Sequence, residues 1–163
     1  MLNDWAIAAE ASTIAALVTT HAWVPLTLKA VHMLALAVVG GAALIADLRL
    51  IGVGLVNHSV ATLHRAARPW FYLGIALLLL SGIPLWMANA TALNAEPLFQ
   101  LKMLVLLLTV LYAITVRDAI IAGAIRVFRG PRLTVRLAGL VSLLLWLTVA
   151  ALGRYQTYTL PVA

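Results

Sequence analysis

The chain has 163 residues, of which 64% are hydrophobic and 10% are charged, and its mean hydropathy is +1.07. Soluble domains are about 45–50% apolar and about 25% charged, so this composition excludes a soluble globule as well as a disordered chain. The absence of cysteine excludes disulfide frameworks, thiolate zinc sites, iron–sulfur clusters and cysteine nucleophiles. We therefore expect the lipid bilayer to surround most of the chain.

The first residues differ in character from the rest. They carry Asp4 and Glu10 but no basic residue, whereas a secretory signal begins with basic residues. Large apolar side chains such as Trp5 and Leu17 are interleaved with polar ones, which is typical of a helix lying in the membrane interface. We predict an interfacial helix over residues 1–21, on the outer surface.

Four apolar segments follow, each long enough to cross a bilayer. A hydrocarbon core of about 30 Å requires about 20 helical residues. The segments cover about residues 24–51, 69–88, 98–116 and 137–153. The predicted fold is therefore all-α: an integral membrane four-helix bundle with an N-terminal interfacial helix, forming a single membrane domain over residues 1–163.

The basic residues orient the predicted spans. Eight of the 11 lie in or beside the connections that follow the first and third spans, where the positive-inside rule places the cytoplasm. We expect a multi-pass protein of the bacterial inner (cell) membrane, with both termini outside, in the periplasm. Because topology accounts for the net charge of +6, we expect no nucleic-acid partner. The eight are Arg49, Arg65, Arg68, Arg117, Arg126, Arg129, Arg132 and Arg136.

Ionisable side chains within a span are rare and point to function. Lys29 and Arg49 are about 30 Å apart along the first span and can reach opposite membrane surfaces, which places His32 about one turn inside the outer boundary. When the other three spans are placed antiparallel to their neighbours, further cationic and sulfur-bearing side chains lie at this depth. They are Met33, Met87, Lys102, Met103 and Arg154.

This outer layer is a candidate cofactor site. Histidine with a thioether sulfur suits haem iron or copper, and cationic side chains can hold haem propionates or another anion. Haem b is the first candidate, and copper is the second. The candidate cofactor-binding residues are His21, Lys29, His32, Met87, Lys102, Met103 and Arg154, and the candidate metal ligands are His32 and Met103.

A structural interpretation of the same layer stays open. Methionine fills gaps in apolar cores, lysines extend to the membrane surface, and His32 can hydrogen-bond a carbonyl group. Ser81 and Ser142 lie in apolar runs, where we expect no matching histidine and acid at their depth, so a hydrolase site is not predicted. No series of acids and histidines crosses the middle of the spans, so a proton relay is not predicted either.

The inner end gathers acids, arginines and histidines. Asp47 lies about one turn inside the inner boundary, and we predict that it forms an ion pair that fixes the first loop to the bundle. His58 and His64 are six residues apart and would point in different directions on one helix, so we do not predict a metal site there.

Three segments resemble an uncharacterised family of small bacterial inner-membrane proteins. They are LTLKAVHMLALAVVGGAALIADLRLIG from Leu26, ARPWFYLGIALLLLSGIPLW from Ala67 and NAEPLFQLKMLVLLL from Asn94. The resemblance covers about residues 12–116 and implies a membrane fold without implying an activity. Two positions depart from the family pattern: Lys29 stands where an acid is usual, and Arg117 where a histidine often ends the third helix. The family-type positions are His32, Asp47, Arg49, Pro69, Trp70 and Lys102.

Three functions are compatible with these features. The first is a small membrane subunit of a redox or electron-transfer system that binds a b-type haem or a quinone near the outer face, together with other membrane or periplasmic subunits. The second is a non-catalytic scaffold or accessory subunit, and the third is transport of a small solute or copper. Whether the chain is an enzyme is left open, although an isolated chain is expected not to be one. The four-helix plan is distantly similar to copper-resistance and cytochrome b-type membrane proteins.

Overall fold

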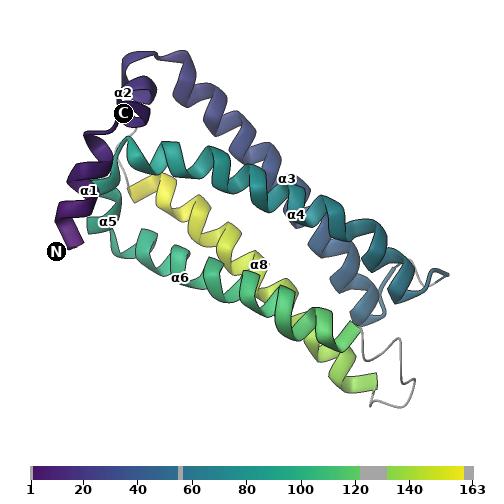
Figure 1. Ribbon diagram of the computed structural model, residues 1–163. Coiled ribbons are helices and arrows are strands. Elements are labelled where there is room, and N and C mark those ends of the chain that lie inside the picture. Colours follow the sequence, from purple (N-terminus) through teal and green to yellow (C-terminus); the bar gives the residue numbers. More distant parts are fainter. Residues whose placement is uncertain (1, 55–56, 122–131, 160–163) are drawn as a thin grey trace.

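The computed structural model describes residues 2–54, 57–121 and 132–159, and within these ranges every regular element is a helix (Figure 1). Two short helices precede four long membrane-spanning segments. The elements are α1 (Leu2–Glu10), α2 (Thr13–Thr20), α3 (Trp23–Ile51), α4 (Val60–Met87), α5 (Ala90–Ala95), α6 (Pro97–Tyr112), the π-helix η1 (Ala113–Arg117) and α8 (Arg132–Thr159).

The described residues contain four helices long and apolar enough to cross a membrane, which confirms the predicted fold class. They are Trp23–Ile51, Val60–Met87, Pro97–Ile121 and Leu133–Gln156. The second helix begins at residue 60, not at about 69 as the sequence predicted. Ser59 explains this start, because its Oγ accepts a hydrogen bond from Thr62 N at 3.1 Å and caps the helix. Pro69 consequently lies inside α4 and does not begin it.

The α3 helix contacts two of the other three spanning helices. It packs against α4 on one side and α8 on the other, while α6 packs against α8 (Figure 1). Glycine permits both close approaches: a Cβ at Gly74 would lie 2.9 Å from Val39 N, and one at Gly139 would lie 2.8 Å from Asp47 O. Small residues at such crossings let helix backbones approach in a membrane, where packing drives association.

The core lies along α3, with aromatic rings at its centre. Phe71 and Trp146 meet edge to face, with ring centroids 5.8 Å apart, and Val39 is fully buried beside them. Many leucines on the outside of the bundle are exposed, for example Leu80 at 70% and Leu26 at 67%. Exposure of so many large apolar side chains to water would be unfavourable. This surface suits contact with lipid.

Helices α1, α2 and α5 gather at one end of the bundle, which we call the α5 end (Figure 1). The predicted single helix over residues 1–21 is two helices, because Ser12 Oγ caps α2 by accepting a hydrogen bond from Ala15 N at 3.2 Å. The Trp5 ring stacks on Trp86 at 5.1 Å. The N-terminal segment therefore packs against the end of α4, a contact that the sequence did not predict.

Candidate functional site

All four spanning segments contribute a polar side chain to one layer near the α5 end. We call it the His32 layer; its members are His32 from α3, Ser81 from α4, Lys102 from α6 and Gln156 from α8. Ser81 and Gln156 are buried, and His32 and Lys102 are half-buried. Polar groups at such a depth are costly in a bilayer and need partners.

The hydrogen bonds of Ser81 indicate which nitrogen of the His32 ring carries a proton. Ser81 Oγ lies 2.6 Å from Leu77 O, to which it donates its only proton. The 2.9 Å contact between His32 Nδ1 and Ser81 Oγ therefore has the imidazole Nδ1–H as donor. In the neutral ring this leaves Nε2 with its lone pair, able to accept a proton or bind a metal ion. Gly82 makes room for the ring, since a Cβ there would lie 3.0 Å from His32 Cε1.

Lys102 completes the layer from the opposite pair of helices. Its Nζ donates to Gln156 Oε1 at 2.7 Å and lies 5.1 Å from the centroid of the Phe99 ring. Gly153 lies beside the aliphatic stem, where a Cβ would be in ordinary contact with Lys102 Cδ at 3.9 Å. The ammonium group is close enough to His32 for their charges to interact. The layer thus combines an ammonium group with an imidazole ring.

The other predicted site residues lie around this layer. Met33 and Met103 are 60% and 45% exposed, respectively, and lie on the outer surface of the bundle. Lys29, Arg154 and His21 are exposed, and the His21 ring lies beside Trp23 with a centroid distance of 6.4 Å. Met87 is half-buried at the end of α4. Within the described ranges, no three histidine, aspartate or glutamate side chains are grouped so that they could hold a metal ion.

The sequence prediction missed two members of the layer. Ser81 and Gln156 were not predicted, and Ser81 has a histidine at its depth while Ser142 has an acid. Neither contact has the arrangement of a hydrolase triad, in which the serine donates to a histidine that is held in turn by an acid. A lone hydroxyl within an apolar run was the available signal, because such a group needs a partner inside the bundle.

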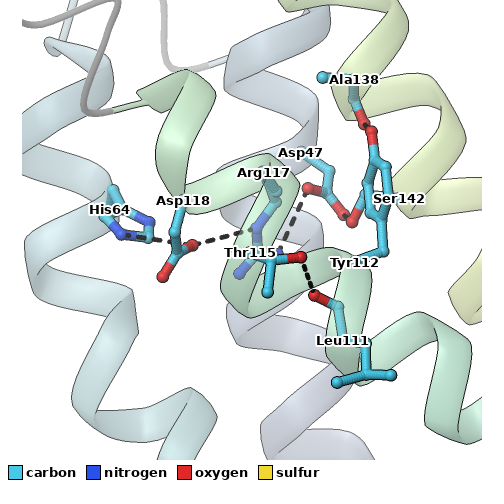
Figure 2. Close-up of polar contacts among 9 residues, drawn as sticks. All are labelled: Asp47, His64, Leu111, Tyr112, Thr115, Arg117, Asp118, Ala138 and Ser142. Carbon is cyan, nitrogen blue, oxygen red and sulfur yellow. Dashed lines mark hydrogen bonds and ion pairs between the residues drawn. The ribbon is translucent and has the colours of Figure 1, made fainter.

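A second polar group lies at the other end of the bundle (Figure 2). We call it the Asp47 cluster; its members are Asp47, His64, Arg117, Asp118 and Ser142. Asp47 is fully buried: its Oδ2 accepts from Ser142 Oγ at 2.7 Å, and its Oδ1 lies 3.5 Å from Arg117 Nη1. Asp118 Oδ1 lies between Arg117 Nε at 3.6 Å and His64 Nε2 at 3.7 Å.

The ion pair predicted for Asp47 is therefore confirmed, but its partner is on the third span. The first loop is held differently, because Arg49 Nε donates to His58 O at 2.7 Å. Arg117 reaches Asp47 from the π-helix η1, whose wide turn inserts an extra residue and changes the direction of the side chains that follow. Its guanidinium also lies 5.2 Å from the centroid of the Phe71 ring.

A protein-family model matches most of this chain. The model, described as a family of unknown function (DUF6644), covers residues 4–159. Neither the curated proteins nor the solved structures contain a match. The match agrees with the resemblance to an uncharacterised family, and nothing in the comparisons supports the distant similarity to copper-resistance or cytochrome b-type proteins.

Proposed function

The chain belongs to the DUF6644 family, and we propose that it is a small membrane subunit of an electron-transfer system that binds the headgroup of a membrane quinone in the His32 layer. The observation that carries the proposal is the convergence of a lysine ammonium group and a histidine imidazole at one depth, in a layer built from four helices. From the arginine distribution we also propose that this layer lies on the outer side of a bacterial inner membrane.

The two side chains suit the two redox states of a quinone. The Lys102 ammonium can donate a hydrogen bond to a quinone carbonyl, and the His32 Nε2 lone pair can accept the proton of a quinol hydroxyl. Oxidation of a quinol releases two electrons and two protons. His32 would accept one proton and pass it to water, and a water molecule would accept the second proton directly. A redox partner protein would accept the two electrons. The proposed partners are therefore other membrane or periplasmic redox subunits.

A b-type haem or copper is less well supported by the same geometry. Met33 and Met103 lie on the outer surface, so a second axial ligand for iron or copper beside His32 would have to come from Met87 or from His21. A quinone headgroup needs hydrogen-bonding groups only, which the layer supplies.

A scaffold role is the second candidate. It is favoured by the existing bonds of the layer, since Lys102 is paired with Gln156 and His32 with Ser81. In that case the polar groups would serve helix association alone. The two candidates differ in whether a quinone competes with Gln156 for the ammonium.

Quinone titration of the detergent-purified protein tests the proposal. We expect quenching of tryptophan fluorescence by a short-chain quinone, and at least about tenfold weaker binding in Lys102→Met, because a hydrogen bond from a charged group contributes about 1.5–3 kcal/mol. Lys29→Met is the matched control, since Lys29 is exposed and outside the layer. Binding that is absent, or that is weakened equally in both variants, would contradict a quinone site and favour the scaffold. An absorption spectrum with a Soret band would favour haem.

A further inference from the structure

A small cavity lies beside the Asp47 cluster, between α4 and the third span. Its volume is about 10 Å³, and its lining includes His64, Arg117, Asp118 and the small side chain of Ala46. A space of this size holds one water molecule if polar groups line it. The lining here provides a guanidinium, a carboxylate and an imidazole.

Two atoms of the lining residues lack hydrogen-bond partners. Arg117 Nε and Asp118 Oδ1 are both buried and make no hydrogen bond with any described group. They lie 3.6 Å apart, which is beyond good hydrogen-bond geometry, and the Arg117 side chain is only 4% exposed. One atom is a donor and the other an acceptor, and each is costly to leave unpaired inside a membrane bundle.

We infer that this cavity binds one water molecule, which accepts a hydrogen bond from Arg117 Nε–H and donates one to Asp118 Oδ1. A water at about 2.8 Å from each atom would lie beside the 3.6 Å pair, on its cavity side, and not between the two atoms. His64 Nε2, 3.7 Å from the same Asp118 oxygen, provides a third polar neighbour. Buried waters of this kind make about three hydrogen bonds.

The bound water joins two pairs of side chains into one network. The His64–Asp118 pair on one side is connected through Arg117 to the Asp47–Ser142 pair on the other, as the arrangement in Figure 2 makes visible. The network then crosses from α4 through the third span and α3 to α8. It is independent of the quinone site, which lies toward the opposite end of the bundle.

Nuclear magnetic resonance of the full chain in detergent, with ¹⁵N-labelled arginine, tests this inference. The Arg117 Nε–H signal is assigned by its loss in Arg117→Lys. We expect a cross-peak between this proton and water, with the sign of a long-lived dipolar contact. We expect its loss in Ala46→Val, which fills the cavity with methyl groups, and its weakening or loss in Ala46→Ser, whose hydroxyl takes the place of the water.

Thermal unfolding separates a hydrated cavity from a dry one. Displacing the water with Ala46→Val leaves Arg117 Nε and Asp118 Oδ1 unpaired, so the midpoint falls, and it falls less in Ala46→Ser. If no water cross-peak appears in the wild-type chain, or if Ala46→Val raises the midpoint as filling a dry cavity does, the inference is wrong. Should Ala46→Val fail to fold, the wild-type cross-peak alone decides the question.

Discussion

Ser142 and Asp47 are both fully buried, and the serine hydroxyl donates to Asp47 Oδ2 at 2.7 Å across the interface of α8 and α3. The second carboxylate oxygen faces Arg117 on the third span at 3.5 Å. One carboxylate therefore connects three spanning segments. A charge in the bilayer is stable only with such partners, so each partner becomes essential for the others.

Replacing Asp47 tests this dependence. Asp47→Leu removes one of the two carboxylates beside the buried Arg117 guanidinium and leaves Asp118 as the other, and we expect it to lower the free energy of unfolding by up to about 3–5 kcal/mol. Ser142→Ala removes one hydrogen bond from a buried charge and should cost about 1–3 kcal/mol. Denaturant unfolding followed by circular dichroism measures both. The double variant Asp47→Leu/Arg117→Leu should regain much of the loss, and a double variant less stable than Asp47→Leu would contradict the coupling.

The glycine at the crossing of α3 and α4 provides a second prediction. A Cβ at Gly74 would overlap the Val39 side chain and lie 2.9 Å from its backbone nitrogen, whereas a Cβ at Gly41 meets nothing within 4 Å. We expect Gly74→Ala to lower the free energy of unfolding by about 1–3 kcal/mol, because α3 and α4 must separate. Gly41→Ala is the matched control within the same pair of helices and should be neutral or slightly stabilising in the same unfolding measurement. Equal effects of the two variants would show that the crossing is not tight.

The fold followed from the sequence because apolar length and charge distribution are local properties. The four spans are present as predicted, and the main error was the start of α4, where Ser59 begins the helix well before the apolar run. Helix capping outside the membrane does not depend on hydropathy. A prediction based on apolar length therefore makes such a helix too short. The separation of α1 from α2 at Ser12 has the same cause.

The site was predictable only in part. His32 and Lys102 could be assigned to one depth from helical rise, and the structure brings them into one layer. Ser81 and Gln156 could not be assigned, because depth does not determine which way a helix is rotated. Rotation also separates Met33 from its neighbour His32, since consecutive residues of a helix face different directions. The partner of Asp47 depended on a π-helix, which has no clear sequence signal.

Acidification should release the N-terminal segment. Glu10 Oε1 accepts hydrogen bonds from Thr91 Oγ1 at 2.7 Å and from Thr91 N at 2.8 Å, and these bonds, the side-chain one first, hold the pKa of Glu10 below its ordinary value of 4.5. A group whose pKa is lowered on folding stabilises the folded state above its unfolded pKa, and that contribution is lost as the pH falls through the folded pKa. We therefore expect the contact between α1 and α5 to weaken below about pH 4.5.

The stacked rings of Trp5 and Trp86 report this contact. Tryptophan fluorescence in detergent should change as the pH falls below the ordinary pKa of Glu10. Glu10→Gln should remove that change, because its amide does not titrate. Asp4→Asn is the control for removing a carboxylate from the same helix, because the hydrogen bonds from Thr91 are accepted by Glu10. A fluorescence change that persists unaltered in Glu10→Gln would assign the transition to another group.

The bond between Ser81 and His32 leads to a prediction about the histidine itself. Because Ser81 Oγ donates to Leu77 O, it can only accept from His32, so the neutral ring must carry its proton on Nδ1. The ¹⁵N chemical shifts of the His32 imidazole should therefore show an Nδ1–H tautomer at neutral pH. Ser81→Ala removes one acceptor of the ring and leaves the hydrogen bond to the Leu78 backbone, so it should raise the population of the other tautomer, while Ser142→Ala should leave the His32 shifts unchanged.

The same substitution connects the tautomer to the proposed function. When the proton moves to Nε2, that nitrogen can no longer accept a proton from a quinol, and we expect Ser81→Ala to weaken quinol binding more than quinone binding. Parallel titrations with the oxidised and reduced forms of one short-chain quinone, in the wild-type chain and in Ser81→Ala, measure the difference. Equal weakening of both forms would mean that Ser81 only positions the ring, whereas a wild-type ring protonated on Nε2 would remove the chemical basis of proton acceptance at this site.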